Sequence, residues 1–166
     1  MIHDENPFAS TADDPFRRFR GRLAAPVTII TSGEDRKTGL TVSSLFVVEG
    51  DPPLVYAVVG PNSDLFDAVQ ETGKFVVHIA REGHEGVAEV FAGLRPSPGG
   101  LFSTVEWEPS AWGPLLESMP DRALCTVVSM DETGWSGVLT GSIDELQVAD
   151  ITSPLVHFRG KYRRLA

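Results

Sequence analysis

Short apolar runs, rich in β-branched residues and separated by polar turns, cover most of this chain. Each run is bounded by glycine, proline or a polar cluster, and this pattern is typical of strands. Runs that follow one another across a short polar segment predict hairpins, with turns around residues 32–39 and 131–134. The predicted strands cover residues 27–31, 40–48, 54–59, 75–80, 101–107, 123–130, 137–148 and 155–158.

Three segments carry the spacing and the capping residues of short helices. The first follows Asp13 or Asp14 and has Pro15 in its first turn. The second begins at Ser63 and ends at Gly73, and the third covers residues 85–92. Because strands and helices do not alternate regularly, the pattern predicts a mainly β protein, an antiparallel barrel with a few helices packed outside it. We expect residues 1–12 to be disordered and residues 13–166 to form a single domain.

The charge is negative overall but unevenly distributed. The 166 residues include 14 Lys and Arg against 23 Asp and Glu, a formal net charge of −9, which argues against a nucleic-acid partner. The basic residues gather near the two ends of the chain, where we expect a solvated or ion-paired face; an anion site is the alternative. The two groups are Arg17, Arg18, Arg20 and Arg22, and Arg159, Lys161, Arg163 and Arg164.

Several classes of chemistry are excluded or disfavoured by the composition. The single cysteine, Cys125, lies in an apolar run, so we expect a buried structural thiol and no intramolecular disulfide. The four histidines are scattered without cysteine partners, and we expect no metal site. No apolar stretch resembles a secretory signal or a membrane span, so we expect a cytoplasmic protein without a membrane partner.

A small polar cluster stands at the head of an apolar strand. Thr41, Ser43 and Ser44 place three hydroxyls within four residues, and Ser63 follows at the expected start of a helix. Each has an ordinary explanation, as edge-strand hydroxyls and as a helix N-cap. A helix N-terminus with free N–H groups is also a suitable place for an anion.

Taken in order, several blocks of the sequence resemble the flavin reductase-like family, the small FMN-binding split-barrel proteins that partner two-component monooxygenases. The resemblance runs from about residue 16 to residue 165. The blocks are PVTIIT (26–31), GLTVSSL (39–45), DPPLV (51–55), PNS (61–63), TGKFVVHI (72–79), VFAG (90–93), LCTV (124–127) and PLVHFRGKY (154–162).

The resemblance implies a split β-barrel and a set of flavin contacts. The segment 41–45 would run along the isoalloxazine ring, where small hydroxylated residues supply hydrogen bonds without bulk. The start of the second helix would bind the phosphate. Phe91 resembles a position beside the flavin, although a core aromatic is equally consistent, and Arg159 and His157 resemble positions at the open face of the ring or the dimer seam. The implied cofactor-binding residues are Thr41, Val42, Ser43, Ser44, Pro61, Asn62, Ser63, Phe91 and Arg159.

Two departures from the family pattern stand out. Asp64 and Leu65 follow Ser63 where the family often has Ser-x-Thr, so affinity for FMN is expected to be modest. The Gly-Asp-His of the family's late hairpin is here Gly134-Trp135-Ser136. The residues on the nicotinamide side would then be Trp135, Ser136 and His157, with His157 the one candidate catalytic residue. Trp135 would either pack against the core or a neighbouring subunit, or stack on the flavin or the nicotinamide.

The resemblance therefore implies an NAD(P)H:flavin oxidoreductase. It would pass a hydride from NADH or NADPH to FMN or FAD, as a homodimer, with a monooxygenase as the candidate partner that receives the reduced flavin. The alternative is a flavin-binding split-barrel protein without efficient reductase activity, a carrier or sensor, which the missing Asp-His pair favours. A third hypothesis is a split-barrel protein that binds no flavin.

Overall fold

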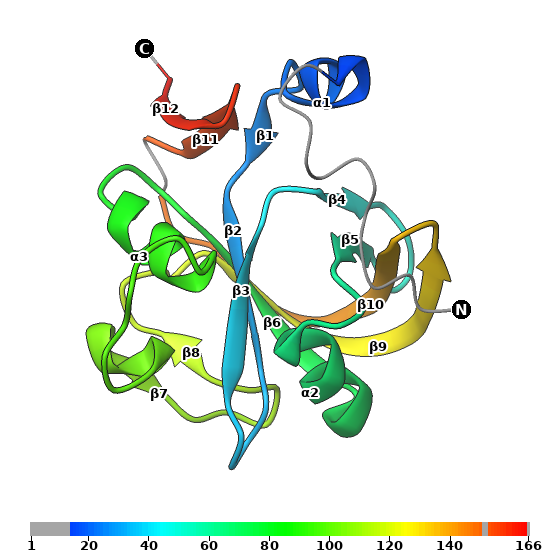
Figure 1. The fold of residues 1–166 in the computed structure, drawn as a ribbon. Helices are drawn as coiled ribbons and strands as arrows, with labels where there is room; N and C mark the ends of the chain where they lie inside the picture. Colours follow the sequence, from blue (N-terminus) through cyan, green and yellow to red (C-terminus); the bar gives the residue numbers. More distant parts are fainter. Residues whose placement is uncertain (1–13, 151–152, 166) are drawn as a thin grey trace.

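The computed structural model describes residues 14–150 and 153–165, which form a curled antiparallel sheet, a small sheet beside it and short helices (Figure 1). Two predictions fall outside the described residues: the disorder of residues 1–12 and Asp13 as the alternative cap of the first helix. The helices are α1 (Pro15–Arg20), α2 (Asp64–Thr72), α3 (Glu85–Phe91) and the 3₁₀ helix η1 (Leu101–Thr104). The strands are β1 (Ala25–Pro26), β2 (Thr28–Ser32), β3 (Thr38–Val42), β4 (Leu45–Val48), β5 (Leu54–Val59), β6 (Lys74–Ile79), β7 (Trp107–Glu108), β8 (Leu115–Leu116), β9 (Arg122–Thr133), β10 (Ser136–Gln147), β11 (Leu155–Phe158) and β12 (Lys161–Arg164).

The main sheet has seven strands in the order β3-β2-β6-β9-β10-β5-β4 and curls into a partly closed barrel. Its two edge strands, β3 and β4, are separated in sequence only by Ser43 and Ser44. Two residues can join opposite edges only if the sheet curls until those edges come close together. The prediction of a mainly β antiparallel barrel is confirmed.

The single strand predicted over residues 40–48 is wrong, because it is two strands on opposite edges. Val42 pairs with Thr28 of β2, and three residues later Leu45 pairs with Ala57 of β5. The chain therefore changes partner at Ser43-Ser44, where the backbone carbonyl of Ser44 accepts a hydrogen bond from Val58 N (2.9 Å). A hydrophobic pattern shows that a segment is extended but does not show which strand it pairs with.

The longest hairpin joins β9 and β10, of 12 residues each, through a turn at Gly134-Trp135. Gly134 has φ +61°, a conformation that suits glycine. The turn predicted over 131–134 is too early, because the pairing runs on to Thr133 and Ser136. Register shifts within the hairpin mark bulges, which bend long strands around a barrel.

The barrel interior is filled by side chains from both halves of the sheet. Phe75 at the centre is fully buried, and Gly141 lies so close that a Cβ there would be 2.4 Å from the ring. Buried residues of α2 close one side, as the spacing predicted. The core cluster comprises Ile30, Val42, Val55, Ala57, Val59, Leu65, Phe66, Val69, Phe75, Val77, Ala123, Cys125, Leu139 and Ile143.

The helix caps follow the sequence predictions. The side chain of Asp14 accepts a hydrogen bond from Phe16 N at the start of α1. Ser63 Oγ accepts one from Phe66 N (3.2 Å) at the start of α2, and Gly73 ends that helix with φ +69°. The apolar side of α1 is nevertheless exposed, with Phe16 at 55% and Phe19 at 68%.

The strand predicted over residues 101–107 is mostly wrong. Residues 101–104 form η1, and only Trp107–Glu108 is a strand. The Ser103 hydroxyl donates to the Gly100 carbonyl (2.7 Å), and that of Thr104 donates to Leu101 (3.3 Å). Such local bonds from Ser and Thr to the backbone compete with strand pairing.

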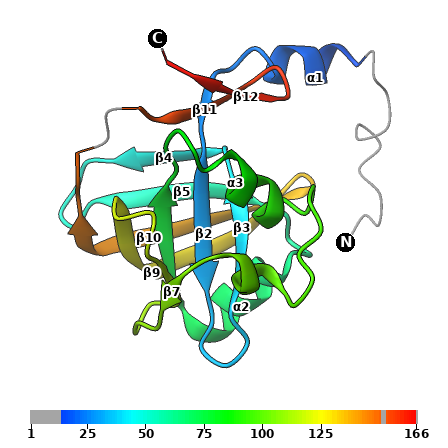
Figure 2. The same cartoon turned by 90° about the vertical axis from the view of Figure 1, so that its left-hand side faces the viewer.

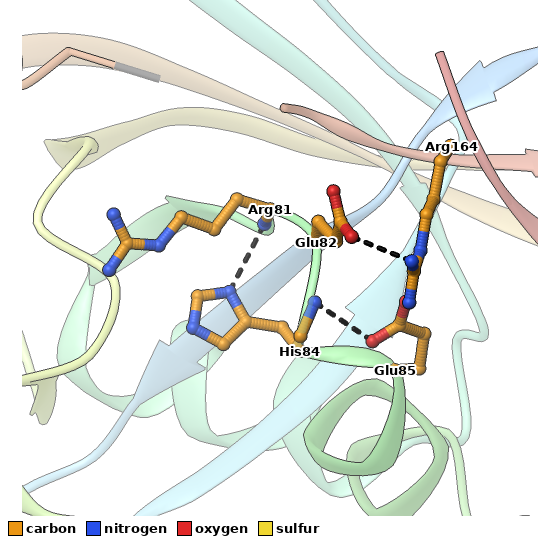
Figure 3. A network of polar contacts seen from close by, with 6 residues as sticks. Arg81, Glu82, His84, Glu85 and Arg164 are labelled. Carbon is orange, nitrogen blue, oxygen red and sulfur yellow. Dashed lines mark hydrogen bonds and ion pairs between the residues drawn. The ribbon is translucent and has the colours of Figure 1, made fainter. Parts of the chain in front are cut away.

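The small sheet β1-β11-β12 and α1 lie together beyond one end of the barrel (Figure 2). The basic C-terminal tail is thus a strand, which the sequence prediction missed. Arg164 of β12 forms ion pairs with Glu82 (2.7 Å) and Glu85 (3.7 Å), next to the start of α3 (Figure 3). These exposed pairs add little stability individually, but they join the small sheet to the barrel.

Candidate functional site

A cavity of about 1230 Å³ lies between α1, the small sheet and the junction of β3 and β4. Three parts of the chain far apart in sequence meet around it, so tertiary structure alone creates it. Its lining residues are Arg17, Arg18, Arg20, Gly21, Arg22, Leu23, Ala24, Ala25, Pro26, Ser43, Ser44, Leu45, Phe46, Val58, His157, Arg159 and Gly160.

The described lining of this cavity is strongly basic. It contains five of the chain's 14 basic residues, together with His157, and no Asp or Glu, although the chain has 23 acidic residues. The arginines near the N-terminus are exposed, as expected of a solvated face, but they also converge with Arg159 on one cavity. A concave surface of one charge sign raises the local concentration of ligands of the opposite sign. The cavity is therefore suited to an anionic ligand.

Backbone hydrogen bonds fix the arginine-bearing segments against each other. Gly21 N donates to Arg17 O (2.9 Å) and ends α1, while Arg159 N donates to Gly21 O (2.9 Å). Arg159 has φ +52° and begins the tight turn between β11 and β12. Its guanidinium lies 5.3 Å from the centre of the Phe158 ring. The turn therefore holds Arg159 beside the C-terminal end of α1.

His157 stands on β11, in the middle of the small sheet. It pairs with Ala25 of β1 and with Tyr162 of β12. Its ring meets that of Tyr162 edge to face, with centroids 5.8 Å apart. This half-buried imidazole is the one histidine among the described lining residues.

The opposite wall combines small hydroxyls with apolar surface. Within the described part of the chain the Ser43 and Ser44 hydroxyls form no hydrogen bond, so their donors and acceptors are available to a ligand. Leu45, Phe46 and Val58 continue this wall. An apolar wall with a few polar groups is typical of sites for aromatic ligands.

The remaining predicted contacts do not line this cavity. Thr41 Oγ1 donates to Ala88 O of α3 (2.6 Å), and Val42 is buried in the barrel core. Ser63 uses its hydroxyl twice, as the N-cap and as a donor to Gly60 O (2.7 Å), and Pro61 and Asn62 lie on the same turn.

Phe91 is a core residue of this chain. It is 2% exposed and meets Phe102 edge to face at 5.5 Å. It also lies over Gly39, where a Cβ would be 2.7 Å from the Phe91 ring. Of the two interpretations of Phe91, the packing supports the core aromatic.

Trp135 and Ser136 lie at the tip of the β9–β10 hairpin, outside the cavity lining. Trp135 is 37% exposed. The structure thus brings together Ser43, Ser44, His157 and Arg159 out of the predicted set.

Sequence reasoning missed the apolar wall, and it named an anion site at the basic groups only as the alternative to a solvated face. The group itself was visible as Arg17, Arg18, Arg20 and Arg22, but its convergence with Arg159 depends on β11 pairing with β1. The ring of Phe46 stacks on that of Tyr56, with centroids 5.2 Å apart, across strands β4 and β5. The prediction of one continuous strand over residues 40–48 gave no indication of this contact.

Two buried titratable groups among the described residues lie outside the cavity. Burial raises the pKa of Cys125 to about 12, and nearby Asp144 adds to the rise, so this thiol is structural, as predicted. Burial lowers the pKa of His78 to about 3. No group of three or more potential metal ligands occurs among the described residues. Across residues 14–150 and 153–165, no helix is long and apolar enough to span a bilayer.

The fold and cavity together define a class: a partly closed antiparallel barrel with a basic binding cavity beyond one end. Comparison with known families makes the class specific, because the model of the flavin reductase like domain matches residues 20–166. The chain belongs to this family, as the sequence blocks indicated.

Individual relatives agree with this assignment. The chain is 31% identical over 153 residues to an NADH-dependent flavin reductase of a Rhodococcus species, with 90% of this chain and 84% of the relative covered. It is 29% identical over 154 residues to the reductase component of 4-hydroxyphenylacetate 3-monooxygenase of Thermus thermophilus, covering 92% and 96%. The NADH:FAD oxidoreductase SgcE6 of Streptomyces globisporus, solved with NAD and FAD fragments, superposes with a TM-score of 0.82 at 25% identity, covering 91% of each chain.

Proposed function

We propose that this protein is an NAD(P)H:flavin oxidoreductase that binds its flavin in the arginine-lined cavity. The observation that carries the proposal is the pairing of two walls, one of uncommitted serine hydroxyls and apolar side chains, the other of guanidinium groups. The first wall fits an aromatic ring with polar edges, and the second fits phosphate. A bound flavin would supply the hydride-accepting chemistry.

The residues of the cavity would position the ligands without acting as strong acids or bases. Ser43 and Ser44 would hydrogen-bond the polar edge of the ring, and Arg159 would bind phosphate. His157 carries the one imidazole among the described lining residues, and it would stand beside the ring as a positioning or proton-holding group. Hydride transfer depends chiefly on bringing two rings face to face, which such a site achieves by orientation.

The cosubstrate would be NADH or NADPH, and the flavin would be FMN or FAD. The names of relatives support both parts, since they include an FMN reductase (NADH) and an NADH:FAD oxidoreductase. Pro61, Asn62 and Ser63 stay a second proposed phosphate contact, at the N-terminus of α2.

We propose a homodimer in the cytoplasm, with a monooxygenase as a partner and neither nucleic acid nor membrane among its ligands. Exposed apolar side chains support the dimer: Phe46 is 58% exposed and Val47 61% on edge strand β4. An uncovered apolar edge strand is normally protected by a neighbour. Relatives named as monooxygenase reductase components support the partner.

The first test is flavin binding by thermal shift. Millimolar FAD or FMN should raise the melting temperature, because a ligand of the native state stabilises it. The double variant Ser43→Ala with Ser44→Ala should lose most of that shift, while Ser129→Ala, a serine of β9 outside the cavity lining, should keep it. A protein whose melting temperature neither flavin changes would refute the proposal and support a split barrel without flavin.

The carrier or sensor alternative rests on the hairpin tip, where Trp135 and Ser136 replace the family's Asp-His. We expect retained flavin binding with a high Michaelis constant for NAD(P)H, because no imidazole is available at this tip. Introducing the pair, Trp135→Asp with Ser136→His, should lower that constant without changing flavin affinity, and Trp135→Ala is the control. A low micromolar Michaelis constant in the wild type would contradict the expectation.

A further inference from the structure

The arginine wall is larger than a single phosphate requires. Five guanidinium groups line the cavity, four from residues 17–22 and one from the β11–β12 turn. A single guanidinium group is enough to bind a phosphate in bidentate fashion. FMN carries one phosphate, so this wall has more donors than FMN can use.

Among the described residues, no Asp or Glu lines the cavity, and no ion pair involves three of its arginines, Arg18, Arg22 and Arg159. Like charges around one concave surface repel one another. The chain has a net charge of −9, so carboxylates that could pair with these arginines are abundant elsewhere in the sequence. A ligand with several phosphate oxygens would relieve the repulsion among Arg18, Arg22 and Arg159.

The size of the cavity points in the same direction. Its volume of about 1230 Å³ exceeds the range of roughly 300–1,000 Å³ that is usual for small-molecule sites. The serine and apolar wall occupies only part of the lining, and the arginine segment extends beyond it from Arg17 to Arg22. The cavity thus has room for a ring system at one wall and a diphosphate at the other.

We propose that the arginine segment at the end of α1, residues 17–22, binds the diphosphate of a dinucleotide. This inference rests on the proposed function and makes it more specific. If the diphosphate belongs to the flavin, the protein prefers FAD over FMN. If it belongs to the nicotinamide cosubstrate, the segment instead sets the affinity for NAD(P)H.

The test is calorimetric binding of ADP, AMP, FAD, FMN and NAD⁺ to the full chain. The informative variant is Arg18→Gln with Arg22→Gln, one lining residue within α1 and one just beyond its end, both outside any ion pair among the described residues. The control is Arg36→Gln with Arg163→Gln, which removes the same charge from outside this cavity. The wild type should bind ADP more tightly than AMP.

The expected result is a loss of ADP affinity of about tenfold or more in the Arg18/Arg22 variant, the scale of a charge-assisted hydrogen bond, and little change in the control. An accompanying fall in the FAD-to-FMN affinity ratio assigns the diphosphate to the flavin. An unchanged ratio with weakened NAD⁺ binding assigns it to the nicotinamide cosubstrate.

Failure of this inference differs from failure of the proposed function. Equal losses in the informative variant and the control, or equal affinity for ADP and AMP in the wild type, would overturn the diphosphate assignment even if flavin binds. Arginine-dependent ADP binding in a protein that binds neither flavin would keep the assignment and reject the flavin oxidoreductase.

Discussion

The buried imidazole of His78 makes the fold sensitive to acid. It is 0% exposed on β6; Nδ1 donates to Ile29 O (3.0 Å), and Nε2 accepts from Leu116 N (3.1 Å). The Nε2 bond requires the neutral ring, because protonation would place a proton on Nε2 against the Leu116 N–H, whereas the Nδ1 bond can form in either protonation state. Burial lowers the pKa to about 3; the Ile29 bond opposes this fall, and positive Arg122 adds to it.

The sign and size of the effect follow from linkage. The unfolded chain binds a proton at this residue below pH 6.5, whereas the folded chain does not until about pH 3. The free energy of unfolding therefore falls as the pH falls through this window. From pH 7.5 to pH 5 the expected loss at His78 is about 2 kcal/mol.

Urea unfolding at pH 7.5 and pH 5, at one fixed protein concentration, measures this loss. The His78→Gln variant removes the titrating group and keeps an acceptor for Leu116 N–H. It should be less stable at pH 7.5 by about 1–3 kcal/mol, because the Ile29 carbonyl loses its donor. Its further loss on going to pH 5 should be about 2 kcal/mol smaller than that of the wild type. An equal loss in both proteins would refute the linkage argument.

Two further predictions concern packing. Gly141→Ala should lower the free energy of unfolding by about 1–3 kcal/mol, because the new methyl would lie 2.4 Å from the Phe75 ring. The control Gly60→Ala, where a Cβ would have no non-adjacent neighbour within 4 Å among the described residues, should change the free energy of unfolding little when both variants are unfolded in urea. Phe91→Leu should lower the melting temperature of the protein through the lost contact with Phe102 but leave the flavin dissociation constant within about twofold, and a tenfold weaker constant in calorimetry would place Phe91 at the flavin instead.

Most elements of the barrel were predictable because their signals are local. The cap at Ser63, the ending at Gly73 and the spacing of buried residues between them define α2 without tertiary information. The β9–β10 hairpin was likewise predictable, with an error of about two residues at the turn. The β3–β4 split was not predictable, because the serines that separate the strands are compatible with an extended chain.

The candidate site was predictable only in part, for a similar reason. Ser43, Ser44, His157 and Arg159 were identified by resemblance, and the structure places all four around one cavity. The arginines of residues 17–22 carry no local signal of binding, since charged residues on a short exposed helix usually form a solvated surface. Their meeting with Arg159 depends on long-range pairing of β1 with β11.

The most direct test of the proposed function is oxidation of NADH or NADPH by the purified protein with FAD or FMN added, followed by absorbance. We predict dinucleotide oxidation that requires the flavin and that falls when Ser43 and Ser44 are both replaced by alanine. A protein that binds flavin but oxidises neither dinucleotide, even at millimolar concentration, would contradict the oxidoreductase and establish the carrier or sensor in its place.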